Sequence, residues 1–394
     1  MGDFDKISAR TVPQISEVDP AHWDACANPD VGKHNPFVSH AFLRALEASG
    51  SVGPGTGWMA QHLLVSDDGG SLGGVMPLYL KTDSQGEYVF DHAWAEALHR
   101  VGGRYYPKLQ CAVPFTPVPG RRLLARPGPG AETMQRVLAS AAVGAAEQIG
   151  CSSLHITFAT EEEWALLGGM GFLQRIGQQF HWRNEGYSSF DDFLATLASR
   201  KRKAVRKERA EAHGAGLAIE QLSGAQIMEA HWDAFFDFYL ETGSRKWGRP
   251  YLNRAFFSLL GEAQGDRCLL IMAKRAGRYV AGALHLIGGD CLFGRYWGAI
   301  EHHPFLHFEL CYYQGIEYAI AHGLARAEAG AQGEHKLARG YLPEATYSLH
   351  WIREPRLEAA VRRYLEAERA EMTTLVEVLR AQGPYRHGEA QRDD

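Results

Sequence analysis

The sequence predicts a mixed α/β protein that consists of two related halves, each with its own strands and covering helices. The chain has 394 residues, whereas a single domain usually holds about 100–200 residues, so two domains are expected. A series of helix and strand patterns in the first half also recurs, in the same order, in the second half. This repetition favours a duplicated fold over one large domain.

Four segments of the first half have counterparts in the second. The first pair reads as short helices with proline in the first turn. The next two pairs read as strands of a hairpin joined by glycine-containing turns, and the last pair as a further strand. The matched segments are residues 36–46 and 250–260, 62–65 and 268–271, 74–78 and 282–286, and 90–95 and 293–298. Each match is short, but the conserved order favours a duplication.

A long helix and another strand complete each half. In the first half, residues 131–149 are rich in alanine and helical in pattern, and residues 153–158 resemble a strand. Residues 305–322 and 325–329 show the same two patterns in the second half. The order helix, helix, hairpin, strand, helix, strand predicts a mixed sheet covered by helices.

The domain boundaries follow from this order of elements. We expect a first domain over residues 1–185 and a second over residues 186–352, and the second opens with a charged helix at 189–213. Residues 353–382 then read as one amphipathic helix, because their apolar positions fall on one side. Residues 383–394 are polar and are expected to form a disordered tail.

Composition restricts the class of protein further. The formal net charge of −5 gives the molecule as a whole no attraction to nucleic acid or anionic lipid. The six cysteines lack CxxC spacing, which is typical of reduced thiols in a reducing compartment. The N-terminus shows no secretory signal, and no run of apolar residues is long enough to span a membrane. We therefore expect a cytoplasmic protein without a membrane span.

Several short motifs, spread over nearly the whole chain, resemble those of a known family. They are residues 35–37, 105–109, 113–124, 199–203, 295–298 and 328–336. The chain is similar to the FemAB-like family of predicted N-acyltransferases of peptidoglycan biosynthesis or recognition, in which the GNAT (N-acetyltransferase-type) fold occurs in tandem. The resemblance implies transfer of an acyl or aminoacyl group from an activated donor to an amine. It implies acyl-CoA or aminoacyl-tRNA as co-substrate, no permanently bound cofactor and no metal.

The most polar segment of the chain, residues 328–340, follows a predicted strand. A sheet holds groups at its strand ends in fixed positions, which suits catalysis. An amine must be neutral to attack a carbonyl, so a carboxylate or imidazole here is expected to accept its proton. The candidates are Glu328, Glu334 and His335 for proton transfer, and Gln332, Lys336 and Arg339 for binding a phosphate or carboxylate. Glu328 and His335 are the first choices, and an ordinary polar loop is the alternative.

His303 is a further candidate for proton transfer, because it lies in the histidine-rich segment 301–307 just before a predicted helix. Pro304 places His303 outside that helix, so His303 and His307 do not form a pair of metal ligands with i, i+4 spacing. A structural role for His303 is the alternative.

A matched pair of strands is expected to line the acyl slot, as the corresponding strand does in GNAT proteins. Its candidate substrate-binding residues are Asp91 and Trp94 in the first half and Arg295, Tyr296 and Trp297 in the second. Buried Asp and Arg side chains need polar partners, so their presence on a strand favours a site. Three more residues are expected to shape the same region in the first half, namely Tyr106, Phe115 and Thr116.

Two segments are candidates for binding phosphate. Residues 120–130 lead into the helix at 131–149, and a helix N-terminus favours anions. The candidates are Arg121, Arg122, Gly128 and Gly130 in this segment, and Lys201, Arg202 and Arg206 in the charged helix. Two prolines remove amide donors from the first segment, so a solvated loop is equally well supported. The charged helix would bind a nucleotide-linked acceptor or the acceptor stem of a tRNA, or would simply be solvated.

The alternative to an enzyme is a non-catalytic protein that recognises a cell-wall or lipid-linked precursor through a degenerate cleft. The sequence leaves open which donor and acceptor are used and which half binds the donor.

Overall fold

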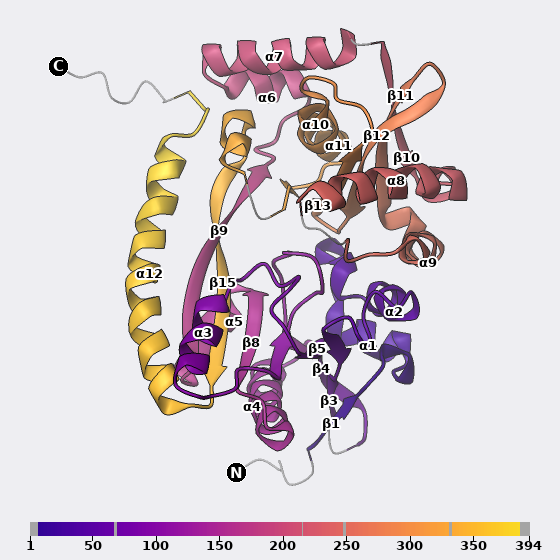
Figure 1. Ribbon diagram of the computed structural model, residues 1–394. Helices are drawn as coiled ribbons and strands as arrows, with labels where there is room; N and C mark the ends of the chain where they lie inside the picture. The colour runs from indigo at the N-terminus through magenta and orange to yellow at the C-terminus, as the bar shows by residue number, and fades with distance from the viewer. Residues whose placement is uncertain (1–6, 67–68, 215, 247–249, 331–332, 387–394) are drawn as a thin grey trace, which may run out of the picture. The chain divides into compact units, whose positions relative to one another are not determined.

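The computed structural model describes residues 7–66, 69–214, 216–246, 250–330 and 333–386, with the side chains of 244–246 excepted (Figure 1). Strands and helices alternate along it, which confirms the mixed α/β class. The chain divides into two compact units. The first comprises Met1–Gly177, Tyr251–Ala263 and Ala345–Thr374, and the second comprises Gln178–Pro250, Gln264–Glu344 and Leu375–Asp394. Each unit therefore takes segments from both predicted domains, in contrast to the sequential division at residues 185 and 186.

The first unit contains two sheets. Its elements in chain order are β1 (Ser8–Val12), α1 (Pro20–Ala27), α2 (His40–Ala48), β2 (Trp58–Ala60), β3 (His62–Ser66), β4 (Leu72–Met76), β5 (Leu78–Lys81), α3 (His92–Arg100), β6 (Lys108–Cys111), β7 (Leu124–Ala125), α4 (Ala131–Ile149), β8 (Ser153–Ala159) and α5 (Glu161–Gly169). The small sheet has the order β1-β3-β4-β7, and the strands β15-β8-β6-β5-β2 are neighbours in the other. Only Pro77 separates β4 from β5, and a residue without a backbone N–H suits this change of sheet.

The strand predicted at residues 90–95 is wrong. Residues His92–Arg100 form helix α3, with Asp91 at its N-cap position. Trp94 and Leu98 are the buried residues of this helix, and their i, i+4 spacing places both on one face. Alanine, glutamate, leucine and arginine in this stretch all favour a helix, and this preference prevails over the short match to the second half. In the first unit the strand that pairs in parallel with β8 is instead β6.

The second unit is built on a sheet with the strand order β10-β11-β12-β13-β14-β9. Its elements are the end of β9 (Leu173–Arg183), α6 (Phe190–Thr196), α7 (Ser199–Gly214), β10 (Leu217–Ser223), α8 (Glu229–Lys246), β11 (Cys268–Arg275), β12 (Arg278–Ile287), β13 (Cys291–Ala299), α10 (Leu306–Phe308), the π-helical turn η6 (Glu309–Tyr313), α11 (Gln314–Ala321), β14 (Arg326–Glu328) and the 3-10 helix η7 (Glu334–Arg339). The charged helix expected at 189–213 is thus divided into α6 and α7. Helix α9 (Arg254–Gln264) falls almost wholly within the first unit.

The last strand of each half pairs with the other half. Strand β9 ends the first half, yet Arg183, Trp182 and His181 pair with β14 in the second unit. Strand β15 (Leu342–Ile352) ends the second half and pairs with β8 in the first unit. This exchange of strands is the physical reason why the compact units do not follow the sequential domain boundary.

Helix α12 (Pro355–Ala381) matches the amphipathic helix expected at 353–382. The chain after it is ordered as far as residue 386, because the Tyr385 hydroxyl donates to the Gly340 carbonyl at 2.7 Å and Tyr385 is bridged to Leu197. The rest of the predicted tail lies outside the described residues. Among the described residues, no helix combines the length and the apolar character that crossing a bilayer requires.

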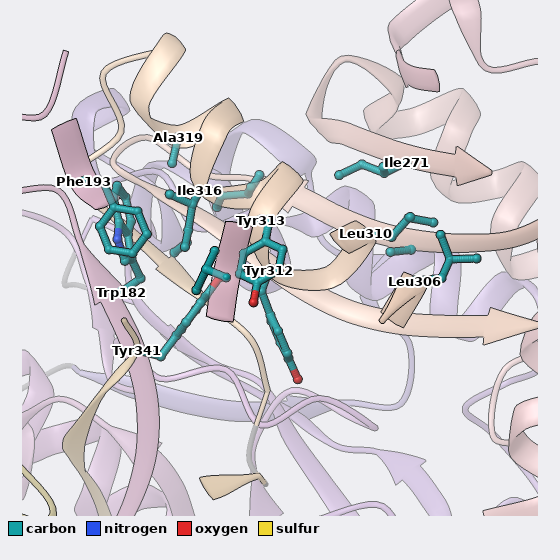
Figure 2. Packing of buried hydrophobic residues seen from close by; sticks show 14 of the residues in the cluster. Trp182, Phe193, Ile271, Leu306, Leu310, Tyr312, Tyr313, Ile316, Ala319 and Tyr341 are labelled. Carbon is teal, nitrogen blue, oxygen red and sulfur yellow. The ribbon is translucent and has the colours of Figure 1, made fainter. Parts of the chain in front are cut away.

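Each unit has its own hydrophobic core. In the first unit, α4 packs on β3, β4 and β8, with Leu138 and Ala142 fully buried. In the second unit, aromatic side chains of α6, η6 and the strands pack together (Figure 2). Tyr312 and Tyr313 of η6 belong to this core, so their hydroxyl groups must find polar partners inside it.

Candidate functional site

In the second unit, strand β14 ends at Glu328, whereas its parallel partner β13 continues. We call this point the divergence of β13 and β14. They pair in parallel only where Cys291–Phe293 lies opposite Arg326–Glu328. Strand β13 continues to Ala299 and remains paired with β12 on its other side. The last paired residue of β13 is followed by Gly294 and then Arg295, so Arg295 is the first long side chain beyond the pairing. The polar groups described next are gathered at this divergence.

The Glu328 carboxylate is fully buried and held by two arginines. Its oxygen atoms lie 3.1 Å from Nη2 of Arg295 and 3.6 Å from Nε of Arg326. Burial by itself would raise the pKa of Glu328, but His181, Arg295 and Arg326 together bring it below its ordinary value. An ionised carboxylate engaged in this way is a weak proton acceptor. Glu328 therefore suits fixing Arg295 at the divergence better than the base role expected from the sequence.

Lys336 is buried at the same place. Its side chain is 2% exposed, and its ammonium nitrogen donates to the Gly330 carbonyl, two residues after β14, at 2.9 Å. The pKa of Lys336 is lowered from 10.5 to about 7, mainly by burial and in addition by the nearby Arg295 guanidinium, while Cys311 opposes the shift. A large part of the Lys336 population is then neutral near pH 7. A buried neutral amine of this kind can accept a proton.

The other residues of the polar segment have different surroundings. His335 and Glu334 are exposed, and His335 Nε2 lies 2.9 Å from the Tyr312 hydroxyl. Arg339 is buried, and its guanidinium binds Glu208 of α7 and the His335 carbonyl. These contacts make Arg339 an anchor between η7 and α7, and its expected role in binding substrate stays a prediction. Gln332 lies outside the described residues.

His303 belongs to a separate cluster. Its Nε2 atom lies 3.0 Å from Glu301, which also binds Arg275 and Arg278. Beyond its last pair with β14, β13 runs on for six residues, about 20 Å, before the turn that carries His303 begins. No contact among the described residues joins His303 to Glu328 or Lys336, so the proton-transfer role expected of His303 has no geometric support.

Tyr296 and Trp297 lie on β13 directly beyond Arg295. The Tyr296 ring packs edge-on against Tyr239 of α8 at 5.6 Å, and Trp297 contacts His307 at 5.2 Å. Both residues are half-buried. The structure therefore brings together Arg295, Glu328 and Lys336 at the divergence, with the two aromatic rings further along the same strand.

The first unit contains a buried polar cluster that includes Asp91. Lys108 Nζ binds Asp91 at 2.5 Å, Glu87 at 2.8 Å and the Ser84 hydroxyl at 2.8 Å. Burial raises the pKa of Glu87 to about 7, whereas Lys108 and His155 outweigh burial at Asp91 and lower its pKa. The cluster joins β6 to the loop before α3 and to the N-cap of α3, so Asp91 is a buried ion-pair partner and does not lie on a strand.

The cluster extends through Tyr105 to two histidines. The Tyr105 hydroxyl donates to Asp91 at 2.7 Å and lies 3.1 Å from His155 Nε2. His155 and His350, opposite each other on β8 and β15, share a hydrogen bond of 2.7 Å between their Nδ1 atoms. Trp94 packs edge-on against His350 at 4.8 Å. Sequence reasoning missed the cluster, although charged or histidine residues within apolar strand patterns signal buried polar groups.

The remaining first-unit candidates pack inside the unit. The half-buried Tyr106 bonds to Ser84 at 2.8 Å. Phe115 is buried and stacks on Tyr251 at 4.8 Å. The Thr116 hydroxyl is buried, and no hydrogen-bond partner is found for it in the described part of the chain.

The phosphate site expected at residues 120–130 requires correction. Arg122 is completely buried, and its guanidinium donates to the carbonyls of Thr157 at 2.9 Å, Gly120 and Arg121 at 3.1 Å each, and Val118. Arg121 likewise binds two backbone carbonyls. Neither guanidinium is available to a phosphate. Gly128 and Gly130 lie in the exposed loop before α4, as the sequence predicts.

In the first unit, Gly120 and Arg122 lie along β8 beyond the end of its pairing with β6. Strand β6 ends at Cys111 while β8 continues to Ala159. Along this continuation, Arg122 Nε donates to the Thr157 carbonyl at 2.9 Å, and the Gly120 amide donates to the Phe158 carbonyl at 3.0 Å. The chain itself therefore occupies the edge of β8, in the place that corresponds to the divergence of β13 and β14.

Most basic residues of helix α7 are exposed or half-buried. Lys201, Lys203 and Lys207 are exposed, Arg202 is half-buried, and Arg206 pairs with Asp191 at 2.9 Å. Glu208 and Arg209 of the same helix bind partners in η6 and η7.

Comparison with known proteins gives one family match and several similar folds. The model of the FemAB-like family, described as peptidoglycan biosynthesis/recognition, matches residues 14–387. No curated protein shows significant sequence similarity to the chain. The crystal structure of FemX is similar, with 14% identity, a TM-score of 0.55, and coverage of 88% of this chain and 98% of FemX.

Two further solved structures are similar, one of them from a putative lysylphosphatidylglycerol synthetase. The C-terminal domain of a putative synthetase from Agrobacterium fabrum shows 8% identity and a TM-score of 0.53, covering 90% of this chain and 97% of the other. L-PGS from Bacillus licheniformis shows 11% identity and a TM-score of 0.50, covering 85% and 99%. At these identities the likeness establishes a shared fold.

Proposed function

The chain belongs to the FemAB-like family of peptidoglycan biosynthesis and recognition, and on this premise we propose that it is an N-acyltransferase whose active site lies where β13 and β14 diverge. The observation that carries the proposal is the buried Lys336 amine, whose pKa is lowered to about 7, beside Arg295 and the end of β14. Burying a lysine without a carboxylate partner is costly, and strongly perturbed groups of this kind cluster at functional sites.

Lys336 is assigned the role of proton acceptor. The neutral acceptor amine attacks the carbonyl carbon of the donor, and a C–N bond forms. Lys336 takes one N–H proton as the C–O bond of an ester, or the C–S bond of a thioester, breaks. The lysine then returns this proton to the departing oxygen or sulfur, so the enzyme ends in its initial state. Glu328 takes no part in proton transfer but fixes Arg295, and the larger part of the rate comes from positioning the two substrates.

The second unit is proposed to bind the donor alone. Its divergence is bordered by Arg295, whereas the matching edge in the first unit is occupied by Arg122 and Gly120 of the same chain. The acceptor is proposed to be an amine-bearing peptidoglycan precursor, because the family is described by peptidoglycan biosynthesis and recognition. Six free cysteines, five of them buried, support a reducing compartment, and we place the reaction in the cytoplasm.

The donor is proposed to be an aminoacyl-tRNA or an acyl-CoA. The exposed lysines of α7 favour the first, because they can neutralise phosphates of a nucleic acid. The loss of Arg121 and Arg122 as phosphate ligands removes the strongest sequence argument for a CoA site in the first unit.

The test is transfer of a labelled acyl group to an amine-bearing precursor peptide, with acetyl-CoA and with an aminoacyl-tRNA as donors. We expect transfer with one of the two donors, and at least a 100-fold loss in Lys336→Met. Lys33→Met is the matched control, because Lys33 is an exposed lysine of the first unit to which no role in binding is assigned, and its rate should stay near that of the wild type. Turnover that survives in Lys336→Met would overturn the assignment of the base. Binding of the peptide without turnover from any donor would instead indicate a recognition protein.

A further inference from the structure

The 3-10 helix η7, which carries Lys336, depends on tertiary contacts for its position. It has six residues, fewer than a helix needs to be stable alone. Glycines with positive φ stand at both ends, Gly333 at 117° and Gly340 at 93°. The location of Lys336 must therefore be fixed by side chains that hold η7 from outside.

Arg339 is the strongest of these anchors. Its side chain is 9% exposed, and its Nη1 atom donates to the His335 carbonyl at 2.6 Å. Its guanidinium also lies 3.4 Å from the centre of the Phe308 ring. Arg339 thus binds the first turn of η7 from within and packs against α10, and the rest of its guanidinium is directed at α7.

Glu208 of α7 receives the Arg339 guanidinium. Nε of Arg339 donates to Oε2 of Glu208 at 3.1 Å and Nη2 donates to Oε1 at 2.8 Å. The hydroxyl of Tyr313 in η6 donates to the same carboxylate, and Figure 2 shows Tyr313 within the core of the second unit. A two-point, charge-assisted pair of this kind fixes direction as well as distance. Glu208 therefore joins α7, η6 and η7.

We propose that Glu208 is a positioning residue for acyl transfer, which acts through Arg339 to hold η7 so that the Lys336 amine stays buried beside Gly330. The inference rests on the function proposed above. Without the Glu208 carboxylate, Arg339 becomes a mostly buried cation that lacks its partner, and moving η7 toward solvent relieves this. Lys336, three residues earlier on the same segment, then becomes hydrated.

Hydration of Lys336 has a specific signature. Burial is the main cause of its lowered pKa, and the charged and titratable groups that act on it are Arg295 of β13 and Cys311 of η6. Neither belongs to η7 or α7, so loss of Glu208 changes the burial of Lys336 and leaves these groups in place. The pKa of Lys336 should therefore rise toward its ordinary 10.5. At pH 7 the first unit of this rise lowers the neutral fraction of Lys336 about fivefold, and each further unit lowers it about tenfold.

The experiment compares wild type with Glu208→Gln, which has the same shape without the charge. Acyl transfer is measured from pH 6.5 to pH 10. We expect kcat of Glu208→Gln to fall at least tenfold at pH 7, with KM nearly unchanged, and to approach the wild-type value by pH 10. Glu211→Gln, an exposed glutamate on the same helix, should keep the wild-type profile. A uniform fall at every pH, or no fall, would overturn the proposal.

A second measurement keeps this test separate from that of the function. The labelling rate of Lys336 by acetic anhydride is followed against pH by peptide mass spectrometry, with melting temperature as a check on folding. An apparent pKa of Lys336 that is at least one unit higher in Glu208→Gln than in the wild type supports the positioning role of Glu208. This holds even if Lys336→Met retains turnover, because that result contradicts only the assignment of Lys336 as the base. An unchanged apparent pKa refutes positioning whatever the activity shows.

Discussion

Unfolding of the wild-type chain at pH 8.5 should take up one more proton than unfolding of Lys336→Met. The reason is that the folded chain buries the Lys336 amine, whose pKa is then about 7, whereas the unfolded chain exposes it with a pKa near 10.5. Between these values the folded state carries a neutral amine and the unfolded state an ammonium. Methionine is similar in length and carries no proton, so it removes this difference alone.

The same difference sets how stability depends on pH. The unfolded state binds the extra proton between pH 7 and 10.5, so this lysine makes the free energy of unfolding rise with pH across that window. Across this window of 10.5 − 7 pH units, at about 1.4 kcal/mol per unit, Lys336 changes the free energy of unfolding by about 5 kcal/mol in total. Below pH 7 and above pH 10.5 the contribution is constant. The gain in the free energy of unfolding of Lys336→Met over the wild type should therefore be largest near pH 7 and should shrink as the pH rises.

Proton uptake is measured directly by mixing each variant with unbuffered guanidinium chloride at pH 8.5 and titrating back. Guanidinium denaturation at pH 7 and pH 9.5 gives the accompanying change in stability. Equal proton uptake by wild type and Lys336→Met would refute the reasoning, because it would mean that Lys336 stays charged in the folded chain. A charged Lys336 could not accept a proton from an amine.

Three further changes test the packing and the surface. Gly298→Ala places a methyl group 2.1 Å from a backbone oxygen of α8 and should cost more than about 3 kcal/mol in urea denaturation, whereas Gly144→Ala, with open space in α4, should gain about 1 kcal/mol. Glu163→Ala removes a buried carboxylate that accepts from three backbone amides and should cost about 3–5 kcal/mol. Lys201→Glu with Lys203→Glu, both exposed on α7, should reduce transfer from aminoacyl-tRNA at least tenfold and leave transfer from acetyl-CoA unchanged. Equal effects on both donors would contradict binding of a nucleic acid at α7.

Much of the local structure can be predicted from the sequence because it follows from local patterns. The alanine-rich pattern correctly indicates α4, and the amphipathic pattern indicates α12 within two residues at its start. The helix expected at 36–46 is divided into a 3-10 turn, Pro36–Val38, and α2, which begins only at His40. The error at Asp91 and Trp94 arises because residues 90–95 match a strand in the second half, whereas the stretch from His92 to Arg100 has the composition of a helix. A weak repeat is a poorer guide there than propensity.

The features that depend on distant contacts could not be predicted. The exchange of β9 and β15 between the units involves strands about 170 residues apart, and no local pattern reports it. Arg122 and Lys336 both lie in segments rich in glycine and charged residues. The Arg122 guanidinium nevertheless binds backbone carbonyls of the chain, whereas the Lys336 amine is buried at the divergence of β13 and β14. Sequence identifies the polar segment around Lys336, but only its burial distinguishes a proton acceptor from a phosphate ligand.

The pH dependence of acyl transfer tests the central claim most directly. In the wild type, kcat/KM for the donor should rise tenfold per pH unit on the acid side and level off above about pH 7, where Lys336 becomes neutral. In Lys336→Met, the rate should be at least 100-fold lower and this inflection should be absent. A wild-type profile with the same inflection in Lys336→Met would show that another group accepts the proton, and the account of the site would be wrong.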